Sequence, residues 1–449
     1  MQRSRSPLGP RFLAVFTASS LSNLSDGILS IGIGLVVISM TTSPTLVGLA
    51  TAAFTLPWLL LGIYSGVVID SSDRRRVIIA ATTLRIACLA TGTLALAANF
   101  MTYPLLLVII FIFGCCEVFA DNAYTVILPS IVPTKRLPAA NSRLLSAQQV
   151  TNNFLGAPLS GFLFAIGSAW AFGIPTALCL AALLVIVFGL RGTYRPAKAE
   201  QNAAKPSRAR HEIKVGISYL FRHPIFRPLV LASAVQNMIY TGYFSVMILW
   251  IVGPNSRMKL AESHYGLLFT MLAIGSICGA MIVEKLLTRF HEIRILGAAW
   301  LTAAALLIVP LIAPNVFAVA AMLLFSGMGN TIGNTVSMTL RQRLIPDELL
   351  GRVFGASQTI NLGLIPIGTI IAGLIAQYAG IPAWIITATV VAVAVVLAAM
   401  RAVPPSAIPP AEHDDASRAP EVASEHPETR RHHSQSDAVV DCADLPSVA

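Results

Sequence analysis

Charged residues are scarce in this chain. Lys, Arg, Asp and Glu make up 12% of its 449 residues, hydrophobic residues make up 55%, and the mean hydropathy is +0.73. A soluble domain carries about twice that charged fraction. The apolar runs between the charges are ~20–27 residues long, enough for a helix to cross a bilayer. Because the runs are continuous rather than alternating, the composition predicts an all-α integral membrane protein.

Signatures that would mark an enzyme or a metal protein are missing. None of the six cysteines has a metal-ligand spacing, and five lie within apolar stretches, which favours reduced packing residues. The sequence has no Walker motif and no nucleophile–base pair on an exposed loop. We therefore expect no enzymatic activity, no metal, no cofactor and no direct use of ATP. The first apolar run, Phe12 to about Met40, is too long for a cleavable signal peptide.

Positive charge is almost absent from one side of the predicted membrane. With the N-terminus inside and twelve spans, all but three of the 31 Lys and Arg residues fall on the inner side. Arg257 and Lys259 fall outside, and Arg85 lies within a span. This asymmetry predicts a multi-pass inner-membrane protein with both termini in the cytoplasm. The cations face anionic headgroups, so lipids rather than nucleic acid are the expected partners.

The twelve predicted spans form two sets of six. We expect an N-terminal half at 1–190, a basic cytoplasmic linker at 191–225, a C-terminal half at 226–400 and a disordered cytoplasmic tail at 401–449. Within the linker, residues 211–223 form an amphipathic helix that either lies on the membrane surface or packs beneath the bundle. The spans are expected at residues 12–40, 45–69, 77–98, 102–126, 140–165, 169–190, 226–252, 263–287, 293–313, 315–338, 351–378 and 381–400.

A weak internal repeat relates the two halves. Gly66-x-x-x-Asp70-x-x-x-Arg74-Arg75-Arg76 ends the second span, and Ala280-x-x-x-Glu284-Lys285-x-x-x-Arg289 ends the eighth, at an offset of 214 residues. Two parallel six-helix repeats are an architecture of secondary transporters, which bind substrate between the halves near the middle of the membrane.

The segment from Gly62 to Arg76 resembles the loop 2–3 signature of the major facilitator superfamily, although Ser71 and Asp73 depart from it. Three further segments are similar to the drug:proton antiporter-3-like branch, which includes macrolide-efflux and enterobactin-export proteins. They are Leu24-Ser25-Asp26-Gly27, Leu128-Pro129-Ser130-Ile131-Val132-Pro133 with Asn141 nearby, and Ile345-Pro346-Asp347-Glu348-Leu349-Leu350-Gly351-Arg352-Val353. The resemblance covers residues 11–400. It implies the major facilitator fold of two six-helix bundles and an exporter function.

The antiporter signature of the fifth span is altered here. This chain has Gly156-Ala157-Pro158-Leu159-Ser160-Gly161, with the proline displaced by one position and one glycine replaced by serine. Proton antiport therefore rests on charged residues elsewhere in the chain.

A gating motif is predicted at Gly66, Asp70, Arg74, Arg75 and Arg76. A carboxylate at the end of the second span can accept hydrogen bonds from the free N–H groups of a neighbouring helix N-terminus. By resemblance, that partner is the start of the eleventh span at Pro346–Asp347. The arginines are expected to pair with Asp121, in a contact that breaks when the halves rock. The alternative is that Arg74–Arg76 only determine topology.

Four charged residues inside the first half are candidates for proton coupling: Asp26, Arg85, Glu117 and Asp121. A charge this deep is costly unless it faces a partner or a cavity. Asp26 is the leading candidate, since a cavity that opens alternately to each side can load and release its proton. Glu117 and Asp121 share a helix face, and either one is an expected ion-pair partner of Arg85. The pair is either structural or exchanges with a proton or substrate.

The second half carries amides rather than charges within its spans. These amides either bind a ligand or join helices to each other. The glycine pairs Gly62/Gly66, Gly275/Gly279 and Gly329/Gly333 are expected to allow close helix packing. The candidate substrate-cavity residues of both halves are Asn23, Trp58, Gln148, Asn152, Gln236, Asn237, Asn330, Asn334, Gln358 and Asn361.

Together these features predict a secondary active transporter that exports an amphipathic small molecule, such as a macrolide or a siderophore, in exchange for protons. We expect it to work as a monomer, with the substrate, protons and lipids as its partners. One alternative is a transporter of the same fold that is not coupled to protons or that moves a lipid or metabolite. A second is a membrane sensor that binds a ligand without transporting it.

Overall fold

The computed structural model describes residues 8–195, 206–253 and 256–403 of the chain. In this part the structure is helical apart from one β-bridge between Val252 and Leu260. Most of the predicted tail, from residue 404 onward, lies outside the described residues, as do residues 196–205 of the predicted linker.

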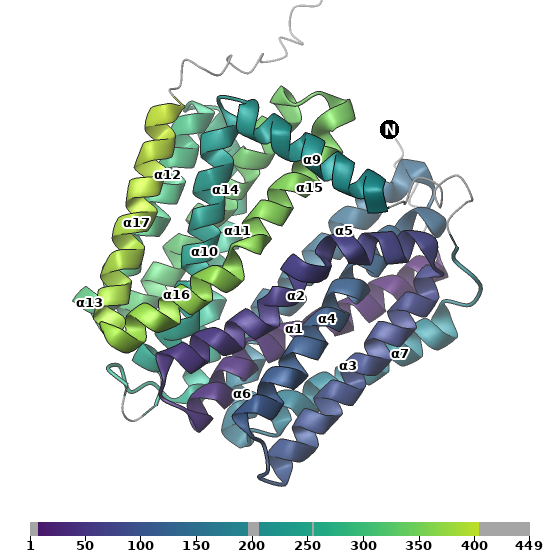
Figure 1. Cartoon of the computed structure of the whole chain (residues 1–449), viewed down its shortest axis with the longest axis horizontal. Helices are drawn as coiled ribbons and strands as arrows, with labels where there is room; N and C mark the ends of the chain where they lie inside the picture. Colours follow the sequence, from purple (N-terminus) through teal and green to yellow (C-terminus); the bar gives the residue numbers. More distant parts are fainter. Residues whose placement is uncertain (1–7, 196–205, 254–255, 404–449) are drawn as a thin grey trace, which may run out of the picture. The chain divides into compact units, whose positions relative to one another are not determined.

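The first group of helices covers the residues before the linker (Figure 1). Its elements are α1 (Pro10–Met40), α2 (Pro44–Ser71), α3 (Arg74–Ala97), α4 (Tyr103–Val126), the short η1 (Leu128–Ser130) and η2 (Thr134–Arg136), α5 (Leu137–Gln149), the π-helical η3 (Val150–Gly156), α6 (Ala157–Ile166) and α7 (Trp170–Gly189).

The second group follows the amphipathic helix α9 (Pro206–Arg222). Its elements are α10 (Phe226–Ile251), α11 (Glu262–Leu287), α12 (Glu292–Ala305), the short η4 (Leu306–Ile308) and α13 (Val309–Ile312), α14 (Val316–Leu344), α15 (Asp347–Gly363), α16 (Ile365–Tyr378) and α17 (Ile381–Ala402).

Eleven stretches of helix in the described residues are long and apolar enough to cross a membrane. All eleven coincide with predicted spans. The remaining predicted span, 140–165, is helical but is divided among α5, η3 and α6. Its first part is polar, and the seven residues of η3 form a π-helix, which is rare and is found mostly at functional sites.

Short polar side chains fix where several helices begin. Ser43 accepts a hydrogen bond from the backbone N–H of Leu46, and Asn315 accepts one from Ala318. Asp73 caps α3 by accepting from the N–H of Arg75 at 3.0 Å, and it also accepts from the N–H of Tyr194 at 3.2 Å. An N-cap satisfies backbone donors that the first turn of a helix leaves free. The departure from the family signature at Asp73 thus has a structural role, because it ties the start of α3 to the chain beyond α7.

The end of the bundle that holds the α2–α3 connection at residues 71–74 and helix α9 is called the basic end here, and the other is the opposite end.

The two groups of helices share one hydrophobic core, and each group also has a core of its own. The shared core includes Ile33 and Val36 of α1 together with Val246 and Ile248 of α10. One further core lies within residues 12–194, and two lie within residues 217–403.

Contacts between the groups are close at the opposite end. The Ser43 hydroxyl donates to Oε1 of Gln377 at 2.8 Å. A Cβ added to Gly48 on α2 would collide with the carbonyl oxygen of Thr369 on α16, and one added to Gly161 on α6 would lie 2.6 Å from the carbonyl oxygen of Glu262 on α11. These glycines therefore allow the backbones of the two groups to touch.

The predicted glycine pairs have different outcomes. A Cβ at Gly275 would collide with the carbonyl oxygen of Leu324, and one at Gly279 would lie 2.7 Å from that of Met328, so α11 and α14 pack through glycine as predicted. Gly329 and Gly333 likewise pack closely, against Ala299 and Trp300 of α12. For Gly62 and Gly66 the prediction was wrong in this conformation, because nothing lies within 4 Å of a Cβ added at either glycine.

Helix α9 packs beneath the bundle, which decides between the two placements expected for it. Leu220 is 1% exposed and lies in a core cluster with Val353 and Ala356 of α15. A Cβ at Gly216 would collide with the carbonyl oxygen of Arg352. Figure 1 shows α9 beside α15 at the top of the view. Residues 211–213 of the predicted apolar face have no described side chains.

His223 lies in the connection between α9 and α10 and stabilises the start of α10, an arrangement called the α9–α10 joint here. Its Nδ1 accepts from the N–H groups of Ile225 at 3.3 Å and Phe226 at 3.4 Å, and its ring lies 4.7 Å from that of Phe226 and 5.5 Å from that of Tyr219. These bonds require the neutral imidazole. Burial lowers the pKa of His223 below its ordinary value of 6.5.

We expect the joint to weaken in acid. A His whose folded pKa is depressed stabilises the fold above its unfolded pKa, and this stability is lost as the pH falls through the folded pKa. The melting temperature of the purified protein should therefore fall between pH 7.5 and pH 5 by more in the wild type than in His223→Asn. Asn is a good cap that does not titrate. His223→Ala should cost about 1 kcal/mol at neutral pH. Equal pH dependence in wild type and His223→Asn would contradict the assignment.

Candidate functional site

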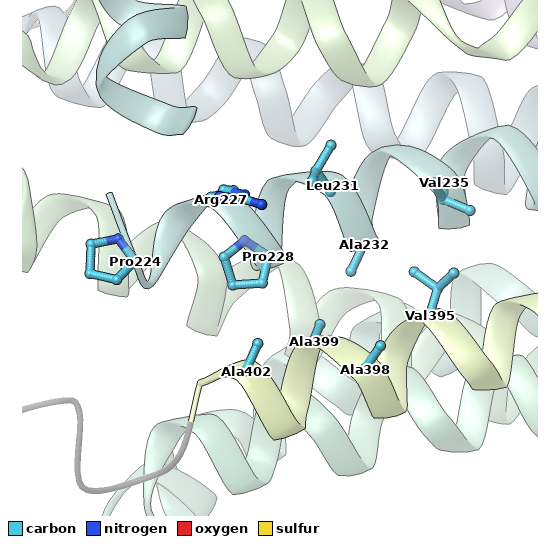
Figure 2. A pocket seen from close by; sticks show the side chains of 10 residues that line it. All are labelled: Pro224, Arg227, Pro228, Leu231, Ala232, Val235, Val395, Ala398, Ala399 and Ala402. Carbon is cyan, nitrogen blue, oxygen red and sulfur yellow. The ribbon is translucent and has the colours of Figure 1, made fainter. Parts of the chain in front are cut away.

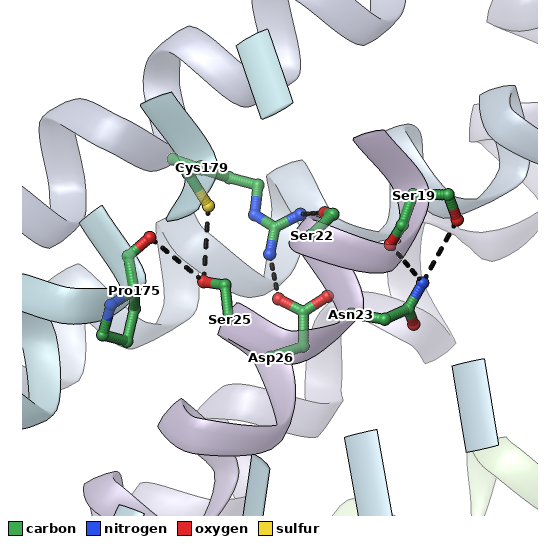
Figure 3. Close-up of polar contacts among 8 residues, drawn as sticks. Ser19, Ser22, Asn23, Ser25, Asp26, Pro175 and Cys179 are labelled. Atoms are coloured by element: carbon green, nitrogen blue, oxygen red, sulfur yellow. Dashed lines mark hydrogen bonds and ion pairs between the residues drawn. The ribbon is translucent and has the colours of Figure 1, made fainter. Parts of the chain in front are cut away.

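Arg85 on α3 is fully buried between α1 and α4. Its Nη1 donates to Oγ of Ser22 at 2.6 Å, its Nη2 forms an ion pair with Oδ1 of Asp26, and its Cζ lies 4.5 Å from the ring centroid of Phe113. Figure 3 shows Ser22 and Asp26 along one side of α1. The predicted pairing of Arg85 with Glu117 or Asp121 was wrong. The reason is that Ser22 and Asp26 lie one turn apart on a helix face turned toward α3, and the sequence does not determine that rotation.

Three carboxyl groups surround this one guanidinium. Glu117 and Asp121 share a face of α4, as predicted, and both lie within the electrostatic reach of Arg85 without a hydrogen bond to it. Oδ2 of Asp26 and Oε2 of Glu117 are buried and have no hydrogen-bond partner in the described part of the chain. If all three carboxyl groups were ionised, two negative charges within the membrane-spanning helices would be uncompensated, at a high cost in free energy. A proton on one or two of them removes that cost.

A small cavity of about 160 Å³ adjoins this charge cluster. It is lined by Asn23 of α1, Asp121 of α4, and Asn141 and Gln148 of α5. Of the predicted substrate-cavity residues, Asn23 and Gln148 line this small cavity. Asn152 is half-buried on η3 and does not line this cavity, and its backbone carbonyl oxygen lies so close to α1 that a Cβ added at Gly27 would collide with it.

The amides of the second half converge on a larger cavity, of about 480 Å³, which we call the amide cavity. All six predicted residues line it, and they come from three helices, α10, α14 and α15. Two further lining residues, Arg341 and Trp300, were not predicted from the sequence. An arginine one turn from a helix end resembles a topology determinant, and a tryptophan in a membrane span resembles an interfacial anchor. The lining is Ser233, Gln236, Asn237, Tyr240, Trp300, Ala303, Asn330, Asn334, Ser337, Met338, Arg341, Phe354, Gln358, Asn361 and Leu362.

Some of these amides join helices to each other, whereas the role of the others in ligand binding stays a prediction. Oδ1 of Asn361 accepts from Ser233 at 2.9 Å, so this pair joins α15 to α10. Nδ2 of Asn334 donates to Oδ1 of Asn330 at 2.8 Å within α14. Gln236 differs, because it is 7% exposed and its Nε2 has no hydrogen-bond partner among the described residues. Such a group is costly unless a ligand satisfies it.

An aromatic cavity of about 370 Å³ adjoins the amide cavity, and both are lined by Tyr240. Phe54 of α2, Phe244 of α10, and Tyr265 and Phe269 of α11 line this second cavity, so both groups of helices contribute to it. No pattern in the sequence indicated it, because aromatic residues that face a cavity or lipid follow the same helical spacing. The predicted Trp58 is half-buried on α2 and lines neither cavity.

The arginines of the predicted gating motif bind within their own group. Nη1 of Arg74 donates to Oγ of Ser130 at 2.9 Å, Nη2 of Arg75 donates to the carbonyl oxygen of Val187 at 3.1 Å, and Arg76 lies 3.9 Å from Asp73. The predicted partner Asp121 is not among these contacts. Asp70 is half-buried at the end of α2, and the side chain of Asp347 is not described.

A groove of about 590 Å³ separates α10 from α17 near the basic end. Figure 2 shows Leu231 and Val235 on one side and Val395 and Ala399 on the other. Its lining is apolar except for Arg227. The groove lacks the amides that would hold a polar solute.

The helices, the buried charge cluster and the two adjoining cavities together define a multi-pass membrane transporter. The family model of the transmembrane secretion effectors matches residues 4–432, so the chain belongs to that family. The resemblance to major facilitator exporters and the expectation of a transporter rather than an enzyme are therefore confirmed.

Curated relatives are distant but extend over most of the chain. An uncharacterized MFS-type transporter, y4rN, from Sinorhizobium fredii is 25% identical over 372 residues, which cover 82% of this chain and 88% of the relative. Macrolide efflux protein A of Streptococcus pyogenes is 21% identical over 83% of this chain and 91% of its own. Enterobactin exporter EntS of Salmonella typhi is 26% identical over 81% of this chain and 85% of its own.

Solved structures support the fold. The nucleoside transporter NupG superposes with a TM-score of 0.67 at 13% identity, covering 87% of this chain and 98% of that one. A bacterial homologue of the human lysosomal transporter Spinster, in an inward-facing and unoccupied conformation, gives 0.64 at 16% identity over 88% and 98% of the two chains. The predicted all-α membrane fold is confirmed.

The charge cluster predicts an unequal response to substitution. Arg85→Gln leaves the buried carboxyl group of Asp26 without its ion-pair partner, and Glu117 and Asp121 without a nearby cation, and should cost about 3–5 kcal/mol of stability. Asp26→Asn should cost less, because Glu117 and Asp121 still balance the guanidinium. Ser22→Ala, which removes one hydrogen bond, should cost about 1 kcal/mol. Thermal unfolding of the three variants in detergent measures the order. A larger loss in Asp26→Asn than in Arg85→Gln would contradict this account of the cluster.

Proposed function

We propose that this chain exports an amphipathic small molecule in exchange for protons, by alternating access between its two groups of helices. The observation that carries the proposal is the juxtaposition of two cavities through Tyr240, one lined by amides and one by aromatic rings. The apolar body of a ligand fits the aromatic cavity and its polar groups fit the amides. The names of two relatives, a macrolide efflux protein and an enterobactin exporter, support this class of substrate.

The proposed orientation places the basic end in the cytoplasm of an inner-membrane protein. The distribution of Lys and Arg supports it. In that orientation, the close glycine contacts lie at the outer face and the amide cavity is reached from inside. The described conformation is then inward-facing and ready to load a substrate from the cytoplasm.

Proton coupling is assigned to the cluster of Arg85 with Asp26, Glu117 and Asp121. A proton that enters when the cluster opens outward neutralises one carboxyl group, and its release inward restores the charge. The small cavity beside Asp121 provides a route for that proton on the inner side. The amide cavity has no carboxyl group among its lining residues, so the proton binds in the first group of helices, apart from the polar end of the substrate.

The first test measures proton movement in inside-out vesicles. An acid-interior gradient is formed, and macrolides and siderophores are added one at a time. A substrate should dissipate the gradient in wild-type vesicles and not in Asp26→Asn vesicles. Asp73→Asn is the matched control, because Asp73 is also buried and Asn preserves a cap, so it should retain the response. Accumulation of labelled substrate without any proton movement would reject coupling and leave transport intact.

The gating motif predicts a second result. Nothing lies within 4 Å of a Cβ added to Gly66 on α2 or Gly355 on α15. We propose that these two glycines approach each other when the basic end closes. Gly66→Leu should therefore fold normally and stop transport by locking the inward-facing state.

Spin labels at Ser71 and Gln342, in a cysteine-free background, report this closure at the basic end. The wild type should show a long and a short distance between the labels, and Gly66→Leu only the long one. Gly48→Leu on the same helix is the opposite control. Its side chain collides with α16 at the opposite end, so it should favour the short distance. A short distance that persists in Gly66→Leu would overturn the gating role.

One observation favours a second candidate function, the movement of a lipid. The groove between α10 and α17 has the size and apolar lining for an acyl chain, with Arg227 placed for a phosphate. Movement of a fluorescent phospholipid between the leaflets of proteoliposomes, without response to any added solute, would favour this candidate over drug or siderophore export.

A further inference from the structure

Arg341 is a cation in a cavity wall without a protein partner among the described residues. It lies on α14, is partly buried and lines the amide cavity, and its guanidinium makes no hydrogen bond or ion pair with that part of the chain. Its neighbour Arg343 is different, because Nη1 and Nη2 form a bidentate pair with the carboxylate of Glu292 at 2.9 Å. A charged side chain within a membrane helix normally has a partner or faces a functional cavity.

Two side chains in the lining of the amide cavity, those of Gln236 and Arg341, carry hydrogen-bond donors without an acceptor among the described residues. The amide oxygens of Asn330 and Asn361 already accept bonds from protein groups. Nε2 of Gln236 is buried without an acceptor among the described residues, and the guanidinium of Arg341 carries five N–H groups. No Asp or Glu belongs to the lining, and Asp121 lines the separate small cavity of the first group. The cavity therefore has one positive charge that no carboxylate in its lining balances, together with a buried amide donor that lacks an acceptor.

We infer that the amide cavity binds the polar end of its substrate through an anionic, oxygen-rich group such as a carboxylate, with Arg341 as the residue that determines charge specificity. This inference rests on the proposed function, because it takes the amide cavity as the substrate site. A carboxylate can accept two parallel bonds from the planar guanidinium and satisfy Gln236 as well. The apolar remainder of the substrate then occupies the aromatic cavity beyond Tyr240.

Two amphiphiles that differ only in charge test the inference. 4-Phenylbutyrate and 4-phenylbutylamine carry the same ring and chain with opposite charges. Binding to the purified full-length protein is followed by the fluorescence of Trp300, which lines the cavity, with Trp300→Phe as the blank. The wild type should bind the carboxylate at least tenfold more tightly than the amine. Arg341→Gln should weaken carboxylate binding about tenfold, since a charge-assisted hydrogen bond is lost, and abolish the preference.

Two further variants separate specificity from structure. Arg343→Gln removes the same charge from the same helix end and should keep the preference, because Arg343 is occupied by Glu292. Arg341→Lys keeps the charge without the planar fork and should restore part of it. Equal affinity of the wild type for both amphiphiles, or a preference that survives Arg341→Gln, would overturn the inference. Because these are binding measurements, a failure of export or of proton coupling leaves them unaffected and is recognised separately.

Discussion

The burial of one guanidinium sets the organisation of the first group of helices. Arg85 has no exposed surface, and its contacts come from α1 and α4. A buried cation must be matched by negative charge, and this requirement holds α1, α3 and α4 at one mutual rotation. Three carboxyl groups lie near this one cation, which is more than charge balance requires. Charge balance alone needs a single carboxylate, and the excess of carboxyl groups is the basis of the proposed proton coupling.

The second group of helices follows a different physical rule. Its spans are joined by amide–hydroxyl bonds and by glycine contacts, which do not change with protonation. Asn361 with Ser233, and Gly275 with Leu324, are examples. The charge cluster and the amide cavity thus lie in different halves of the chain, whereas the aromatic cavity is lined by both halves. The two halves also meet in the shared core, where α1 and α10 contribute side chains.

Much of the fold could be predicted because each membrane-spanning helix corresponds to a long apolar run in the sequence. The polar part of the site was also predictable, since an amide within a span must face a partner or a cavity, and all six amides of the second half do. The partner of Arg85 could not be predicted, because spacing places residues on a face without saying which neighbour that face meets. Gly62 and Gly275 stand in similar spacings, yet only Gly275 touches another helix in this conformation. The aromatic cavity could not be predicted from the sequence, because Phe and Tyr side chains in a span can face lipid, the protein core or a ligand.

The π-helix at η3 has a mechanical consequence. An extra residue inserted in a helical turn makes that turn wider and less firmly bonded than an ordinary one. The fifth span is therefore two α-helical segments joined by a π-helical turn rather than one continuous α-helix. Its first segment, α5, borders the small cavity beside Asp121, and its second, α6, packs against α11 at the opposite end. The change in helical geometry thus falls between the part of the span that faces the charge cluster and the part that holds the two groups of helices together.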